Sequence, residues 1–145
     1  MKARVFRNHS NYSEADLLEV LTSSPDRTEP VCKLYGSCGG CQYQGATYEA
    51  QLKWKRQQVE NSLVRLGGLS VEVEPVIPSP KPYGYRSKLT THFQGGRQGR
   101  ELNIGFLRQG SRRALIEVEA CPIATDAINE ALPAARDELR NAQKR

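Results

Sequence analysis

The sequence predicts an α+β fold, in which short antiparallel strands and two helices are joined by a loop rich in glycine and proline. Three observations support this prediction. Short segments alternate between apolar and polar residues and are bounded by turn residues, which is typical of antiparallel strands. Two longer segments, 47–66 and 125–144, carry apolar residues at helical spacing. Residues 25–45 contain too many prolines and glycines to continue as a helix or a strand.

The elements of the first half follow from these local signals. Strands are expected at 3–8 and 16–22, and the second is followed by the turn sequence Ser-Ser-Pro-Asp. After the loop at 25–45, Thr47 is a suitable N-cap for a helix that runs to about Leu66. Two glycines end this helix, because glycine readily adopts the backbone conformation of a C-cap.

The helix at 47–66 is expected to have two apolar surfaces. At about 100° per residue, Trp54 projects roughly opposite to a stripe of apolar residues. That stripe consists of Tyr48, Leu52, Val59, Leu63 and Leu66. Because one surface is enough to cover a local core, we expect the other to be left uncovered, with Trp54 as the exposed residue.

In the second half, alternation predicts further strands at 71–76, 86–94, 101–108 and 113–119. Prolines at 78–82 end the first of them, and the glycine-rich residues 95–99 are expected to form a hairpin loop between the next two. The helical pattern at 125–144 contains Pro133, which should kink the helix or divide it in two.

The positive charge is concentrated in one segment. The chain has a net charge of +5, yet residues 81–113 alone carry +7 and the remainder −2. The basic residues of this segment are Lys81, Arg86, Lys88, Arg97, Arg100, Arg108, Arg112 and Arg113, and its one acid is Glu101. A local basic block in a balanced chain indicates a binding surface for a polyanion. A solvated strand face remains the alternative interpretation.

The composition indicates a protein of the cytosol. The mean hydropathy is −0.61, and no apolar segment approaches the roughly 20 residues that a membrane-spanning helix needs. The first residues lack the apolar stretch of a secretory signal. We therefore expect a cytoplasmic location and no membrane partner.

The chemistry of the chain is expected at its four cysteines. Three form the pattern Cys32-x5-Cys38-Gly-Gly-Cys41, and the fourth is followed by proline, as Cys121-Pro122. Because a cytosolic chain seldom keeps structural disulfides, clustered thiols indicate a metal. Structural zinc sites usually contain two short pairs of ligands, whereas three clustered cysteines and a remote Cys-Pro are typical of [4Fe–4S] ligation. The spacing favours the cluster and leaves zinc and free thiols open.

The sequence also resembles a known family. The stretch Cys32-Lys-Leu-Tyr-Gly-Ser-Cys38-Gly-Gly-Cys41-Gln-Tyr-Gln44 is similar to the cluster motif of the RNA (uracil-5-)methyltransferases, in their iron–sulfur branch that modifies ribosomal RNA. Residues 24–27 look like the segment that joins the family's N-terminal TRAM barrel to the cluster loop. Residues 85–89 resemble its Tyr-Arg-Asn-Lys segment, and 104–106 and 120–123 resemble the run that leads to the fourth ligand.

This resemblance implies a division of the chain into parts. Residues 1–24 would be a truncated remnant of the TRAM β-barrel, and 25–46 the cluster loop. Residues 47–68 would be a helix that packs on a missing C-terminal catalytic domain. Residues 69–145 would form a β-rich central segment that binds RNA, supplies the fourth cluster ligand and ends in a helix.

The implied function is that of an N-terminal and central fragment of an S-adenosyl-L-methionine (SAM)-dependent methyltransferase. Its target would be ribosomal RNA, 23S in particular, in preference to tRNA, and SAM would bind only to the full-length parent. The [4Fe–4S] ligands would be Cys32, Cys38, Cys41 and Cys121. The residues expected to contact RNA are Tyr85, Arg86, Lys88, Arg97, Arg100, Arg108, Arg112 and Arg113.

The fragment alone is expected to be inactive. Methylation of uracil at C5 uses a cysteine nucleophile and a glutamate base in this family, and all four cysteines belong to the metal motif. No strand, glycine-rich turn and helix for nucleotide binding is recognisable in the sequence. The alternative function is a stand-alone metal-binding module for electron transfer or protein interaction.

Overall fold

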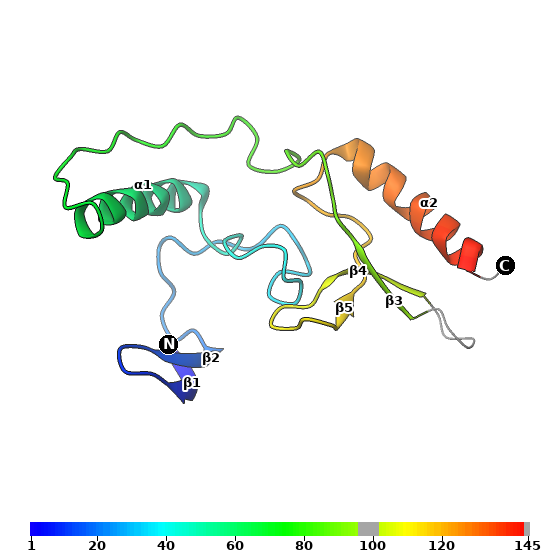
Figure 1. Cartoon of the computed structure of the whole chain (residues 1–145), viewed down its shortest axis with the longest axis horizontal. Coiled ribbons are helices and arrows are strands. Elements are labelled where there is room, and N and C mark those ends of the chain that lie inside the picture. Colours follow the sequence, from blue (N-terminus) through cyan, green and yellow to red (C-terminus); the bar gives the residue numbers. More distant parts are fainter. Residues whose placement is uncertain (96–101, 144–145) are drawn as a thin grey trace.

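The computed structural model describes residues 1–95 and 102–143, which form a small α+β fold with two antiparallel sheets and two helices (Figure 1). The elements are β1 (Lys2–Asn8), β2 (Ser13–Glu19), α1 (Tyr48–Arg65), β3 (His92–Gly95), β4 (Leu102–Leu107), β5 (Leu115–Ile116) and α2 (Asp126–Gln143). The predicted fold class is therefore confirmed at this level. Within the described residues, neither helix is both long and apolar enough to span a bilayer.

The N-terminal hairpin is an open ribbon of two strands, and the described residues form no closed barrel. Its turn is fixed by the His9 N–H, which donates to the Tyr12 carbonyl at 2.8 Å. The His9 ring stacks on the Tyr12 ring at 4.2 Å and lies 2.7 Å from the Glu14 carboxylate. Because this tight turn brings the chain back early, β2 begins at Ser13 and ends at Glu19, several residues before the predicted boundaries.

Helix α1 has the predicted bounds. The Thr47 hydroxyl accepts the Ala50 N–H at 3.3 Å, as an N-cap does. At the other end the Leu69 N–H donates to the Leu63 carbonyl at 3.0 Å, and Gly68 adopts a φ of +63°. The glycine signals therefore placed the end of the helix correctly.

The prediction for Trp54 is wrong. The indole is half-buried and its ring packs at 6.4 Å on Tyr43, because the loop before the helix folds back onto this side. On the opposite side Val59 is 49% and Leu66 88% exposed, whereas Leu52 and Leu63 are half-buried like Trp54. The exposed part of the stripe is thus confined to Val59 and Leu66.

No strand forms at 71–76, in contrast to the prediction. The segment runs past α1 without a neighbouring strand to pair with, so alternation alone does not produce a ladder (Figure 1). Its far end is held by the Ser79 N–H, which donates to the Tyr48 hydroxyl at 2.7 Å.

The three-stranded sheet β3-β4-β5 is antiparallel, but its strands are shorter than predicted. Pairing in the predicted strand 86–94 begins at His92, because Arg86 pairs instead with the segment before α2. The Arg86 N–H donates to the Ile123 carbonyl at 2.8 Å, and the Arg86 carbonyl accepts the Thr125 N–H at 3.1 Å. The strand predicted at 113–119 is reduced to Leu115–Ile116. The predicted loop 95–99 lies outside the described residues beyond Gly95.

Helix α2 contacts β4 and continues through Pro133 as a single helix, so the predicted division does not occur. Two arginines after the proline hold the second half of the helix in place. The Arg136 guanidinium, which is buried, donates to the Val118 carbonyl at 3.0 Å, and that of Arg140 donates to Glu117 at 2.8 Å. The buried side chains beneath the helix and sheet include Leu102, Ile104, Val118 and Ile123.

Candidate metal centre

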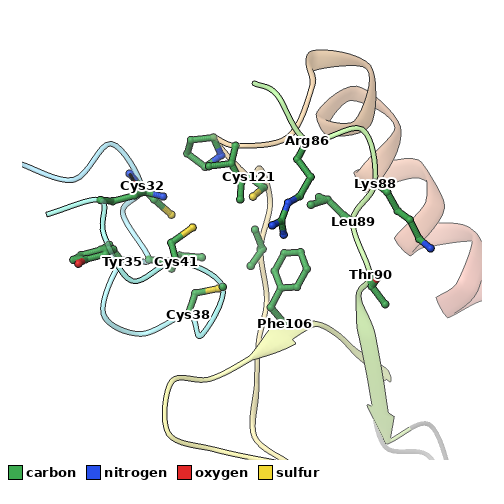
Figure 2. A pocket seen from close by; sticks show the side chains of 16 residues that line it. Cys32, Tyr35, Cys38, Cys41, Arg86, Lys88, Leu89, Thr90, Phe106 and Cys121 are labelled. Carbon is green, nitrogen blue, oxygen red and sulfur yellow. Dashed lines mark hydrogen bonds between the residues drawn. The ribbon is translucent and has the colours of Figure 1, made fainter. Parts of the chain in front are cut away.

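The four cysteines line one cavity of about 310 Å³. Cys32, Cys38 and Cys41 come from the loop before α1, and Cys121 comes from the segment before α2 (Figure 2). All four are half-buried, and none forms a disulfide. The structure therefore brings together the residues that the sequence analysis proposed as metal ligands, across a sequence separation of 80 residues between Cys41 and Cys121.

Tight turns in the loop bring its three thiols to the same side. The Tyr35 N–H donates to the Cys32 carbonyl at 3.0 Å, and the Cys38 N–H donates to the Leu34 carbonyl at 2.8 Å. Gly36 has a φ of +81°, which favours glycine strongly over other residues. A Cβ at Gly40 would lie 3.5 Å from the Cys38 sulfur, which is an ordinary van der Waals contact.

The loop is docked against the edge of β4. The Gly39 N–H donates to the Leu107 carbonyl at 2.9 Å, and the Gln109 N–H donates to the Ser37 carbonyl at 2.8 Å. A Cβ on Gly39 would lie only 3.1 Å from the same Leu107 oxygen, so this approach favours glycine. These contacts fix the loop relative to the sheet that precedes Cys121.

Cys121 is held by an asparagine that the sequence analysis missed. The Cys121 N–H donates to the Asn129 Oδ1 atom at 2.8 Å, and the Asn129 Nδ2 group donates to the Cys121 carbonyl at 3.1 Å. The Cys121 carbonyl also accepts the Ala124 N–H at 2.9 Å, which closes a turn before α2. No motif signals this role, because the asparagine lies within the following helix and away from the cysteine in sequence.

We expect Asn129→Ala to destabilise the turn that carries Cys121. The change removes two part-buried hydrogen bonds and leaves both backbone groups of Cys121 without this partner, which should lower the free energy of unfolding by about 2 kcal/mol. Urea unfolding followed by circular dichroism measures this difference. Asn141→Ala, at an exposed position of the same helix, is the matched control and should change stability by less than about 0.5 kcal/mol. An equal change in the free energy of unfolding for the two variants would contradict this role of the Asn129 side chain.

A second amide, that of Gln44, lies at the other side of the cavity. Its Oε1 atom accepts the Cys32 N–H at 3.1 Å. The side chain is only 7% exposed and lines the cavity, and its Nε2 group has no hydrogen-bond partner among the described residues. The sequence analysis included Gln44 only as the last residue of the cysteine motif.

The electrostatics of the cavity disfavour an unneutralised thiolate at Cys121. Burial raises the pKa of the Cys121 thiol, and the nearby Cys41 and Cys32 raise this pKa further, against the N–H groups of Ile123 and Ala124, which lower it. The Arg86 side chain extends into the same space (Figure 2). A cation bound among the sulfurs would relieve this repulsion.

The described residues contain no group of three or more His, Cys, Asp or Glu side chains close enough to hold a single metal ion. Four thiolates at about 2.3 Å from one zinc ion would lie about 3.8 Å from one another. The cysteines therefore share a cavity without forming such a compact mononuclear shell.

The predicted RNA contacts are distributed over several surfaces. Lys88 is exposed and extends away from the thiols, and the Tyr85 side chain is 53% exposed (Figure 2). Three exposed arginines, Arg108, Arg112 and Arg113, gather at the turn between β4 and β5, beside the cysteine loop. Within residues 1–95 and 102–143, none of these three forms an ion pair. Arg97 and Arg100 lie outside the described residues.

A second, larger cavity of about 760 Å³ lies between the cysteine loop, the start of α1 and the segment before Arg86. Cationic and aromatic side chains line it, among them Lys55, Lys81, Tyr83 and Tyr85.

The two phenylalanines of the β3–β4 hairpin lie in different environments. Phe106 lines the cysteine cavity, but Phe93 is 73% exposed and does not belong to the core. The short strands leave the outer face of β3 uncovered.

The chain is similar to curated proteins over most of its length. It is 37% identical over 130 residues to an uncharacterized RNA methyltransferase of Clostridium tetani, a match that covers 90% of this chain and 28% of the relative. It is 38% identical over 150 residues to the tRNA (uracil(54)-C(5))-methyltransferase of Schizosaccharomyces pombe, a match that covers 97% of this chain and 28% of the relative. Its homologues are named RNA methyltransferases.

A third relative, an uncharacterized RNA methyltransferase of Aquifex aeolicus, is 37% identical over 141 residues, covering 97% of this chain and 32% of the relative. The chain thus spans about 30% of the length of the curated relatives it matches. No protein-family model matches the chain.

Proposed function

We propose that this chain is the part of a SAM-dependent RNA (uracil-5-)methyltransferase that holds a [4Fe–4S] cluster and binds RNA. The observation that carries the proposal is the meeting of four cysteines at one cavity, three from the loop and one from the segment before α2. It is supported by homologues that are named RNA methyltransferases. Free thiols in such number fit a reducing compartment, and we place the protein in the cytoplasm.

The donor set fits an iron–sulfur cluster better than zinc. Four cysteines line the cavity, and four cysteines are the usual ligand set of a [4Fe–4S] cluster. A cavity of about 310 Å³ has room for a group of several atoms. Apolar side chains such as Leu34, Phe106 and Val118 complete the wall, and they would exclude water from a bound cluster.

In this proposal hydrogen bonds of the surrounding chain position three of the four ligands, Cys32, Cys38 and Cys121. Gly39 and its neighbours dock Cys38 on β4, Gln44 holds the backbone of Cys32, and Asn129 holds that of Cys121. A bound cluster would supply a covalent cross-link between the loop and the segment before α2, and a centre able to accept an electron. The Arg86 guanidinium would offset part of the negative charge of the ligated site.

The catalytic step belongs elsewhere in the whole protein. Addition of a cysteine to C6 of uracil needs a free, activated thiol. All four cysteines of this chain line the proposed cluster cavity. We therefore propose that the nucleophile and the SAM site belong to another part of the methyltransferase, and that this chain alone transfers no methyl group.

An RNA titration tests the proposed role in substrate binding. Cations at the turn between β4 and β5 and tyrosines at the second cavity are suited to phosphates and to splayed bases respectively. We expect the anaerobically prepared chain to bind single-stranded RNA and its affinity to fall as the salt concentration rises. In a plot of log affinity against log salt concentration, each phosphate contact should contribute about −0.7 to the slope. Absence of RNA binding at low salt would contradict the proposal.

The same titration addresses the target RNA. The cysteine motif resembles that of enzymes acting on ribosomal RNA, 23S in particular, whereas the Schizosaccharomyces pombe relative is named for tRNA. We propose ribosomal RNA as the target. Competition between a ribosomal RNA transcript and a tRNA transcript at equal salt should therefore favour the former, and a preference for tRNA would reverse this assignment.

A further inference from the structure

We propose that the side-chain amide of Gln44 donates a hydrogen bond to a sulfur of the bound cluster and so makes the cluster easier to reduce. The inference rests on the iron–sulfur function proposed above. It assigns Gln44 a role as a positioning residue that acts on the cluster without being a ligand.

The orientation of the Gln44 amide follows from its hydrogen bond to Cys32. The Cys32 N–H is a donor and lies 3.1 Å from the Oε1 atom, so the oxygen of the amide must face Cys32. The amide cannot be flipped without placing two donors against each other. The NH₂ group therefore faces away from Cys32.

That NH₂ group is buried and has no partner among the described residues. The Gln44 side chain is 7% exposed, and its Nε2 atom forms no hydrogen bond. Buried donors are almost always satisfied, because an unpaired one keeps the full cost of its desolvation. An acceptor that occupies the cavity would remove this cost.

The cavity offers few side-chain acceptors other than sulfur. Apart from the cysteines and Gln44, the side-chain acceptors in its lining are the hydroxyl groups of Tyr35 and Thr90, whereas Arg86 and Lys88 are donors. A bound cluster would present thiolate and sulfide sulfurs to the same space, and sulfur in this state accepts N–H hydrogen bonds. Gln44, which lines this cavity and the second one, thus has an oxygen that holds the backbone of one ligand and a buried nitrogen that has no partner among the described residues.

A hydrogen bond to sulfur withdraws electron density from the cluster. The reduced cluster carries one more negative charge than the oxidised cluster, so the donor stabilises the reduced state more strongly. Removing the donor should lower the midpoint potential. Replacing it with a carboxylate should lower it further, because a negative charge would then face the cluster.

The test compares Gln44→Glu with Gln42→Glu after anaerobic reconstitution of the whole chain with iron and sulfide. Glutamate at 44 keeps the shape and the oxygen that faces Cys32 but replaces the donor, whereas Gln42 is exposed and gives the same change of charge in the same loop. We expect Gln44→Glu to lower the equilibrium constant for one-electron reduction about tenfold, a fall of about 59 mV, in a dithionite titration. Gln42→Glu should shift it far less.

A second variant, Gln44→Leu, removes the donor without adding charge and should also lower the potential. Equal potentials for wild type and both Gln44 variants, or an equal shift in Gln42→Glu, would overturn the inference. If neither Gln44 variant takes up iron while Gln42→Glu does, the amide serves only to fold the loop and the hydrogen-bond proposal fails. If the wild-type chain instead binds zinc or no metal, this result contradicts the proposed function itself, and the inference fails with it.

Discussion

Cys121→Ser is expected to reduce the iron bound after anaerobic reconstitution at least about tenfold, because serine is a poor ligand for iron and the loop alone supplies only three thiols. Cys121 is the one cysteine outside the loop, so this variant tests whether the segment before α2 and the loop form a single site. Iron and acid-labile sulfide are measured on the desalted protein, together with the visible absorption of the cluster.

The matched control for this variant is Ala120→Ser. It adds the same hydroxyl group at the exposed neighbouring position and leaves all four thiols in place, so it should bind iron as the wild type does. Full iron content in Cys121→Ser would show that Cys121 is not a ligand. Loss of iron in both variants would show that the turn before α2, and not the thiol, is what the site requires.

The second large effect is expected for RNA binding in the double variant Arg112→Ala/Arg113→Ala. Both side chains are exposed and neither forms an ion pair within the described residues, so both are available to phosphates. Because the variant removes two cations that would each bind a phosphate, the log–log salt slope should decrease by about 1.4 and the affinity at 0.1 M salt should fall about 25-fold. Fluorescence anisotropy with a labelled single-stranded RNA at several salt concentrations measures both quantities.

This double variant should fold normally, because the turn is held by hydrogen bonds that alanine preserves. The Ser111 hydroxyl accepts the N–H groups of Arg113 and Ala114 at 3.2 and 2.8 Å, and the Arg108 N–H donates to the Ala114 carbonyl at 2.8 Å. The control is Lys53→Ala/Arg65→Ala, which removes the same charge from exposed positions of α1. An equal loss of affinity in the two double variants would mean that the net charge alone determines RNA binding. That result would contradict a specific RNA surface at this turn.

Two of the predicted RNA contacts, Arg86 and Lys88, also line the cysteine cavity. They are two residues apart, but the Arg86 side chain extends into the cavity and the Lys88 side chain extends away from the thiols (Figure 2). The backbone of Arg86 is fixed by its bonds to Ile123 and Thr125, which sets this direction. The RNA contacts at Arg108, Arg112 and Arg113 remain predictions that the salt titration tests.

Local signals predicted the parts of the fold that local forces determine. The bounds of α1 follow from Thr47 at one end and the glycines at the other, because caps act within one turn of the helix. The cysteine loop was also predicted, because proline interrupts regular structure and glycine permits the tight turns. The meeting of Cys121 with the loop was expected from the motif and not from any local rule.

The strands were predicted poorly because their pairing depends on distant residues. Alternation at 71–76 indicated a strand, yet the segment has no partner and stays unpaired. Arg86 forms its backbone bonds with the segment before α2 and not with β4, which shortens β3 to four residues. In each of these two cases the deciding neighbour lies far along the chain, so a short sequence window cannot reveal it.

The positioning residues of the site were not predictable for the same reason. Gln44 and Asn129 are ordinary polar residues in sequence, and their roles depend on hydrogen bonds to Cys32 and Cys121 that only the folded chain forms. In the sequence, the one available signal was that Gln44 ends the cysteine motif. The half-burial of Trp54 was missed because it depends on the loop before α1, which places the Tyr43 ring against the indole.

The metal content of the chain purified without oxygen tests the central proposal most directly. We predict about four iron atoms and four acid-labile sulfides per chain, with little zinc, and a Mössbauer spectrum of a [4Fe–4S] centre. About one zinc ion per chain and no sulfide would contradict the account, because the four cysteines would then form a structural zinc site.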